Sequence, residues 1–305
     1  MNIKVDGGGM QQLREAASRS IRALLATGLQ EGDQPILEVL GGFLDKNNVR
    51  IQSGDLGELL YAAHLYEPNT GMHFIVINEK LLKIADGPTR KMATKRLFCH
   101  ELSHMLLEHP AGFMPPEKMN PALQNAYTAL MQFACDPNNN SRYENEAEVF
   151  SAAIGFWPLE RFTRLFLNAK FDFRQIANDF KMPIDCAVKW ALISFPLPMH
   201  YLKYNVPRQV VEDFYVPTDD YYSVFPWGFQ SGAVFQEPDT TAYKCLHTIK
   251  NDHKDVTTTK QGGKEAAFFC RAFYLKSNET LLRLEDKVIV CGLPNALTGL
   301  FREAQ

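Results

Sequence analysis

The pattern His-Glu-x-x-His at residues 100–104 constrains this chain more than any other stretch of its sequence. Residues 91–107 around it contain no glycine or proline, and their apolar side chains recur at helical spacing. On a helix, His100 and His104 lie one turn apart on the same face, where two imidazoles could hold one metal ion. Glu101 would stand beside them, placed to take a proton from a water that the metal activates. The pattern predicts a buried helix that binds Zn²⁺, against the alternative of a chance match of two ordinary histidines.

A catalytic zinc site also needs a third protein ligand and an open position for water. The extended pattern HExxHxxGxxH fails, because Leu107 stands where it requires glycine and Pro110 where it requires histidine. His109 follows His104 by five residues, which is about 140° around an ideal helix, and it is expected to point elsewhere. We interpret His109 as a residue at the negative end of the helix dipole rather than as a ligand.

A carboxylate on a second helix is the remaining source of a third ligand. Residues 142–153 follow an Asn-rich loop and are expected to form a helix that begins with three acids, Glu144, Glu146 and Glu148. Glu144 and Glu148 share a helix face, whereas Glu146 is about 200° from Glu144 and lies on nearly the opposite side. The alternative needs no metal, since acids in a first turn complement the positive end of the helix dipole.

The two segments, HELSH and ENEAEVFSAAIGFWP, together resemble the ImmA/IrrE family of metallopeptidases. In that family an HExxH helix precedes a segment close to E-x-E-A-N-x-F-A-A-x-L-L-M-P. A strand comes before the helix, as residues 71–78 would here, and the resemblance covers roughly residues 35–195. The matching positions of the second segment are Glu144, Glu146, Ala147, Phe150 and Ala152.

The resemblance implies a site and a substrate class. His100 and His104 would be ligands of Zn²⁺, and Glu144, which opens the second motif, would be the third. Glu101 would be the general base of a zinc endopeptidase. The cleaved protein would be a helix-turn-helix transcriptional repressor, cut in response to stress or to a mobile element.

A second hypothesis is a regulatory protein that docks a partner through a zincin-like domain without catalysis. The intact Glu101 favours the peptidase, because a structural zinc site closes with four protein ligands and needs no base. If Glu144 is the ligand, Glu148 one turn later is expected to orient a ligand histidine. Tyr127 and Tyr143 are candidates for the group that stabilises the oxyanion, by proximity in sequence only.

We expect an α+β protein in three parts. Residues 1–165 would form a zincin-like metallopeptidase domain with a small mixed sheet. Residues 166–204 would form a helix-turn-helix-like unit, and residues 205–305 a mixed α/β or mostly β domain, for which a sensor-like role is one interpretation. In the first part, helices are expected near 10–30, 35–44 and 121–133. The last of these helices lies within an insertion at 110–141. A short strand is expected at 49–51, and a hairpin near 60–66 and 72–78. In the last part, strands are expected at 242–249, 266–275 and 287–291, with a polar loop at 257–263.

Residues 171–180 and 184–192 have the outline of a helix-turn-helix, two helices joined by a three-residue turn. A DNA reader needs basic and amide side chains facing the groove. The charges of this pair balance to zero, and the second helix carries only Lys189 and Asp185. We therefore expect the pair to pack against the peptidase domain, without sequence-specific binding of DNA.

Charge and composition narrow the partners. The net charge of −3 provides no attraction to nucleic acid or to anionic membranes. There is no run of about 18 apolar residues, and the first residues lack the apolar stretch of a signal peptide. The six cysteines form no CxxC pair, which fits reduced thiols better than a disulfide framework. We expect a cytoplasmic protein with Cys99 in its core.

Overall fold

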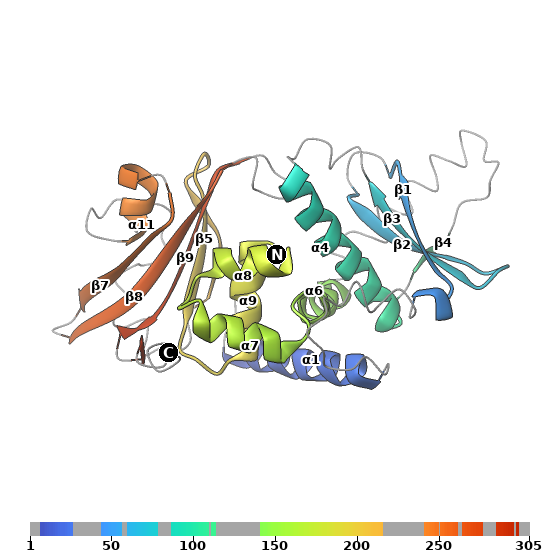
Figure 1. Cartoon of the computed structure of the whole chain (residues 1–305), viewed down its shortest axis with the longest axis horizontal. Coiled ribbons are helices and arrows are strands. Elements are labelled where there is room, and N and C mark those ends of the chain that lie inside the picture. Colours follow the sequence, from blue (N-terminus) through green and yellow to red (C-terminus); the bar gives the residue numbers. More distant parts are fainter. Residues whose placement is uncertain are drawn as a thin grey trace. The chain divides into compact units, whose positions relative to one another are not determined.

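The computed structural model describes residues 7–26, 44–56, 60–78, 87–109, 111–113, 141–215, 241–249, 251–261, 264–276, 285–295 and 297–298. Over these residues the protein is α+β, as expected, with helices and two separate sheets (Figure 1). The chain divides into two compact units. One comprises Ala16–Arg161 and Phe180–Met182 and holds the HExxH motif, and the other comprises Met1–Glu15, Phe162–Asp179 and Pro183–Gln305.

A four-stranded mixed sheet lies in the unit that holds the HExxH motif, with strand order β1-β3-β2-β4. β2 (Ala62–Glu67) and β3 (Met72–Asn78) form the expected antiparallel hairpin. Gly71 precedes β3 with a φ of 68°, a left-handed conformation that glycine adopts without a Cβ clash. β1 (Val49–Gly54) pairs parallel with β3, and the two-residue β4 (Gly112–Phe113) pairs parallel with β2.

The HExxH motif lies in α4 (Gly87–Leu106), which packs against β2, β3 and α6 (Ser141–Gly155). The contact faces are apolar, since Cys99 and Leu102 of α4 and Ala147 of α6 are fully buried. The predicted helix over residues 91–107 is therefore confirmed, and so is the place of Cys99 in the core. The packing holds the motif between a sheet and the second helix that the sequence predicts.

The other unit contains a five-stranded antiparallel sheet with strand order β6-β5-β9-β8-β7. Its strands are β5 (His200–Asn205), β6 (Val210–Tyr215), β7 (His253–Gln261), β8 (Lys264–Leu275) and β9 (Lys287–Pro294). Successive side chains of β8 point to opposite faces. Cys270 and Ala272 join one apolar cluster, which includes Cys245. Phe269 and Phe273 instead meet the rings of Phe171 and Phe173 on the other face.

The helix-turn-helix-like pair consists of α8 (Phe173–Phe180) and α9 (Ile184–Ser194). Arg174 of α8 forms an ion pair with Asp252, just before β7, and donates to the main-chain oxygen of Tyr274 in β8 at 2.9 Å. Phe180, at the end of α8, belongs instead to the unit that holds the HExxH motif, where its ring meets that of Phe156 with centroids 5.4 Å apart. The expected packing on the peptidase domain is therefore met at this end of the pair alone. α9 and most of α8 belong to the same compact unit as the five-stranded sheet (Figure 1). That sheet begins with β5 at residue 200, before the boundary expected at residue 205.

Two elements of this unit correct the sequence-based expectation. Residues 242–249, expected as a strand, are helical, in α11 (Thr241–Tyr243) and a following π-helix (Lys244–Ile249). Cys245 and Leu246 are adjacent and are both buried in one apolar cluster, whereas successive side chains of a strand would point to opposite faces. Residues 257–261, expected in a loop, continue β7, where β-branched threonines pair with β8.

The remaining expectations are met in part. The N-terminal helix is α1 (Gly7–Ala26), and α7 (Leu159–Asn168) precedes the helical pair. Apart from residues 44, 111–113 and 141, the expected helix near 35–44 and the insertion at 110–141, with Tyr127, fall outside the described residues. The cysteines that the structure describes, five of the six, are free thiols. None of the described helices has the length and apolarity required to cross a membrane.

Gly292 in β9 leaves no room for a side chain. A Cβ at this position would lie 2.5 Å from Cε1 of His200 and 2.9 Å from Sγ of Cys270, both of which are fully buried. We expect Gly292→Ala to lower the free energy of unfolding by about 1–3 kcal/mol, because a packed core must shift to admit the methyl group. Urea denaturation measures the loss. Gly87→Ala is the control, since its Cβ meets nothing within 4 Å, and equal stability of the two variants would contradict the expectation.

Candidate metal centre

Two histidines of α4 face one another across one helical turn. The Nε2 atoms of His100 and His104 are 3.1 Å apart, and the ring planes are nearly perpendicular, at 74°. Both rings are half-buried. The i, i+4 spacing of the motif thus brings two imidazole nitrogens to one point on the surface of α4, as the sequence predicts.

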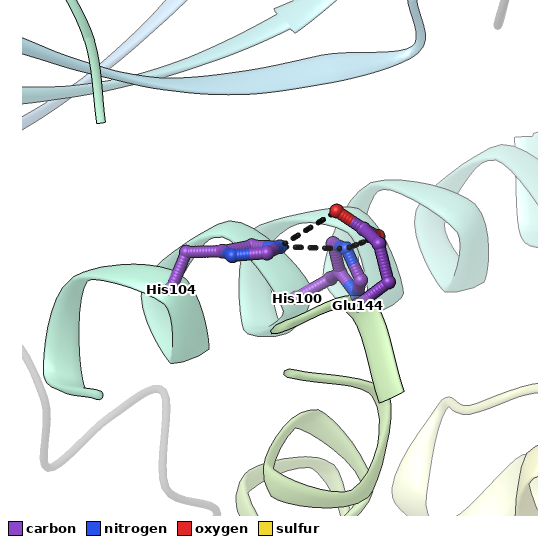
Figure 2. A group of neighbouring side chains, drawn as sticks. All are labelled: His100, His104 and Glu144. Atoms are coloured by element: carbon purple, nitrogen blue, oxygen red, sulfur yellow. Dashed lines mark hydrogen bonds and ion pairs between the residues drawn. The ribbon is translucent and has the colours of Figure 1, made fainter. Parts of the chain in front are cut away.

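Glu144, in the first turn of α6, completes this group (Figure 2). Its Oε2 lies 3.1 Å from Nε2 of His100, and its Oε1 lies 3.5 Å from Nε2 of His104. The ligand atoms of the three side chains all lie within 4.8 Å of one another, so the group could hold a metal ion. Residues 44 positions apart in the chain meet here because α4 and α6 pack together.

The spacing of these atoms fits a metal ion. In a tetrahedral zinc site with bonds of about 2.0–2.1 Å, neighbouring ligand atoms are about 3.3 Å apart, close to the 3.1–3.5 Å observed. A metal also requires neutral imidazoles. Burial, followed by the neighbouring His100, lowers the pKa of His104 to about 3. The pKa of His100 is raised, because the hydrogen bond with Glu144 and the surrounding carboxylates outweigh its burial. Metal binding would therefore displace a proton from His100. Two nitrogens and a carboxylate oxygen are a donor set typical of catalytic zinc.

Glu101 lies beside the three side chains and interacts with the backbone of the four-stranded sheet. Its carboxylate accepts a hydrogen bond from the backbone N–H of His64 in β2. Burial raises the pKa of Glu101 to about 7, with His100 opposing the shift and Glu144 adding to it. A carboxyl group with a pKa near neutrality suits proton transfer in either direction, which general acid–base catalysis requires.

The other two acids of α6 have different partners. Glu148 accepts a hydrogen bond from Nη2 of Arg96 at 2.7 Å, and its Oε1 lies 3.8 Å from Nδ1 of His100. That separation is too long for a hydrogen bond, so the expected orientation of a ligand histidine by Glu148 is limited to a longer-range attraction. Glu146 lies 3.3 Å from Nε2 of His109. Of the three acids, Glu144 alone is grouped with both motif histidines.

His109 does not point away from the motif, and the helical extrapolation for it is wrong. α4 ends at Leu106, and Glu108 adopts a φ of 55°, which turns the chain back. The backbone N–H of His109 then donates to the main-chain oxygen of His104 at 2.9 Å, and the Nδ1 atoms of the two rings are 3.0 Å apart. His109 contacts a candidate ligand without belonging to the group of three.

The hairpin contributes a further pair that the sequence analysis missed. Nε2 of His64 lies 2.9 Å from Nδ1 of His73, and burial, followed by the charge of His73, lowers the pKa of His64 to about 4. His73 pairs with Tyr66, two residues after His64, so both histidines share one sheet face. The sequence could have indicated this pair, because each histidine lies within one of the two strands that were expected to form the hairpin. Tyr143, a candidate for the oxyanion, packs its ring on His109 with centroids 4.7 Å apart.

The comparisons with known proteins address the fold alone. No family model and no curated protein matches the sequence. A solved structure described as a Mycobacterium tuberculosis transcriptional regulator is similar over 95% of this chain and 92% of its own, with a TM-score of 0.56 and 11% sequence identity. The fold and the site together define an α+β protein with a candidate metal centre of two histidines and one glutamate.

Proposed function

We propose that this chain is a zinc-dependent endopeptidase of the ImmA/IrrE type, with a zincin-like domain that cleaves a peptide bond in a protein partner. The observation that carries the proposal is the convergence of His100, His104 and Glu144 beside a fourth group, Glu101, which is not one of the three. Three protein ligands leave a position for water and substrate, as catalytic zinc sites do.

Each residue has a role in this proposal. His100, His104 and Glu144 hold Zn²⁺, which supplies polarisation of the scissile carbonyl and acidification of a water. The carboxylate of Glu101 takes the proton of the attacking water and delivers it to the nitrogen of the leaving amine. The backbone hydrogen bond from His64 in β2 favours the ionised form of this carboxylate, which is the form that takes the proton.

The chemistry of Glu101 favours catalysis over the alternative of a protein that only docks a partner. Burial of a carboxyl group costs stability because it disfavours the charged form, and groups perturbed in this way are concentrated at functional sites. A structural zinc site closes with four protein ligands and has no use for an adjacent base. Among the residues that the structure describes, three potential ligands converge.

The proposed substrate is a helix-turn-helix transcriptional repressor, and this part rests on the resemblance of the two motifs. The structural neighbour is called a transcriptional regulator, which agrees with a role in transcription but at 11% identity adds no more than a shared fold. We propose that the DNA contact belongs to the substrate. Every residue of α9 is buried or half-buried, Lys189 lies 5.8 Å from the ring centre of Tyr201, and Asp185 accepts a hydrogen bond from Lys203.

Metal analysis followed by a cleavage assay tests the proposal. Purified protein is expected to contain one zinc per chain and to cut a repressor encoded near its gene at a discrete position. A chelator should stop the cut, and added Zn²⁺ should restore it. A chain without zinc would contradict the metal centre. Stoichiometric zinc with a stable repressor complex and no cut would instead favour the docking protein.

A further inference from the structure

A row of three side chains leads outward from the candidate ligand His104. The Nδ1 atom of His104 lies 3.0 Å from Nδ1 of His109, and Nε2 of His109 lies 3.3 Å from Oε2 of Glu146. His109 is only 7% exposed, whereas the side chain of Glu146 at the outer end of the row is 26% exposed. The row therefore joins the nitrogen of His104 that faces away from the other ligands to a carboxylate on α6.

The protons of this row fit one arrangement when both imidazoles are neutral, because each ring then carries one N–H. The carboxylate of Glu146 is an acceptor, so Nε2 of His109 must donate to it. Nδ1 of His109 then has only a lone pair and must accept from Nδ1–H of His104. The proton of His104 is thereby placed on Nδ1, which leaves the lone pair on Nε2.

That lone pair points where a metal would need it. Nε2 of His104 faces Nε2 of His100 at 3.1 Å and Oε1 of Glu144 at 3.5 Å. In the other tautomer, an N–H would point into the group of ligands, and one of the two hydrogen bonds of the row would be lost, because the single N–H of His109 could serve either His104 or Glu146 but not both. We infer that His109 and Glu146 are positioning residues, a relay that holds His104 in the tautomer and orientation that bind Zn²⁺; this inference rests on the metal centre of the proposed function.

The fold builds this relay from both helices. The left-handed residue Glu108 returns the chain after α4, and the bond from the N–H of His109 to the main-chain oxygen of His104 fixes the returning segment. Glu146 leaves α6 on a side different from that of Glu144, and it contacts His109 rather than the ligand atoms. The contact of His100 with Glu148, at 3.8 Å, is looser, so the relay supports His104 specifically.

The affinity of the metal-free protein for Zn²⁺ tests the relay without any measurement of cleavage. Competition with a chromophoric chelator gives the dissociation constant. His109→Phe keeps the ring but removes both nitrogens, and should weaken binding about 10–100-fold, the usual cost of removing such a partner. His109→Gln should lose less, because its amide oxygen can accept the bond from His104. Glu146→Gln should cost up to about tenfold.

A double variant separates a relay from two independent effects. If Glu146 acts through His109, the variant with both His109→Phe and Glu146→Gln should bind Zn²⁺ no more weakly than His109→Phe alone. Glu160→Gln is the charge control, because this acid of α7 is exposed and has no place in the row; its effect should stay within about twofold, since solvent screens exposed charges. Additive losses, or His109→Phe with the affinity of the wild type, would overturn the inference.

Ring nitrogen shifts report the tautomer directly. Two-bond ¹H–¹⁵N correlation spectra of the metal-free protein should show His104, one of eight histidines, with its proton on Nδ1, and should show a mixture of tautomers in His109→Phe. A proton on Nε2 in the wild type would overturn the inference. If His109→Phe fails to fold, His109→Gln and Glu146→Gln carry the same comparisons. Zinc binding that responds to these variants without any cleavage would leave the relay standing and contradict the peptidase alone.

Discussion

Glu101→Gln is expected to keep zinc at the wild-type stoichiometry and to lower the rate of cleavage by about 10²–10⁴-fold, the range that a positioned general base contributes. Glutamine has the shape of glutamate but cannot take a proton from water at neutral pH. The carboxylate of Glu101 is not one of the three potential ligand groups, so metal binding should not depend on it. Metal analysis and initial rates of repressor cleavage, on the same preparation, measure the two effects.

Two further variants serve as controls for this result. His100→Ala removes one of the three proposed ligands and should lose both zinc and cleavage. Glu160→Gln, which changes an exposed acid of α7, should lose neither. Wild-type turnover by the Glu101→Gln variant would end the proposed mechanism, and loss of zinc from that variant would place Glu101 among the ligands.

Val188→Asp is expected to lower the free energy of unfolding by more than about 4 kcal/mol, or to prevent folding, because it buries an unpaired carboxylate. Val188 is 0% exposed in α9. The adjacent Lys189→Ala should cost no more than about 1 kcal/mol, the usual value of a partly exposed cation over an aromatic ring. Urea denaturation compares the two variants. Equal stability of Val188→Asp and the wild type would mean that α9 is not packed as described.

The burial of α9 also predicts how the protein behaves towards DNA. A buried α9 has no face to place in a groove, so duplex DNA near physiological salt should not bind sequence-specifically. A gel shift with a defined operator at nanomolar protein, abolished by Lys189→Ala, would contradict this and make the chain a transcription factor with an attached metal centre.

Local patterns in the sequence were enough for the parts of the site that lie within single elements. The i, i+4 spacing of His100 and His104 predicts one face of a helix, and the structure has it. Two strand-like runs on either side of the turn sequence at residues 67–71 predict the hairpin that becomes β2 and β3. Glu144 as partner of these histidines came from the resemblance of the second motif, since helical geometry alone did not separate it from Glu148.

Only the tertiary structure decided the direction of the chain after the end of a helix and the partner against which each face of an element packs. His109 was extrapolated along an ideal helix, but α4 ends at Leu106 and a left-handed Glu108 reverses the chain; glutamate, unlike glycine, is no signal for that conformation. Residues 242–249 include an aromatic and β-branched residues that are common in strands, yet they are helical, with the adjacent Cys245 and Leu246 both buried in the cluster of the five-stranded sheet. Periodicity specifies which residues of one element share a face, whereas turns between elements and the partner of each face depend on contacts between segments far apart in the chain.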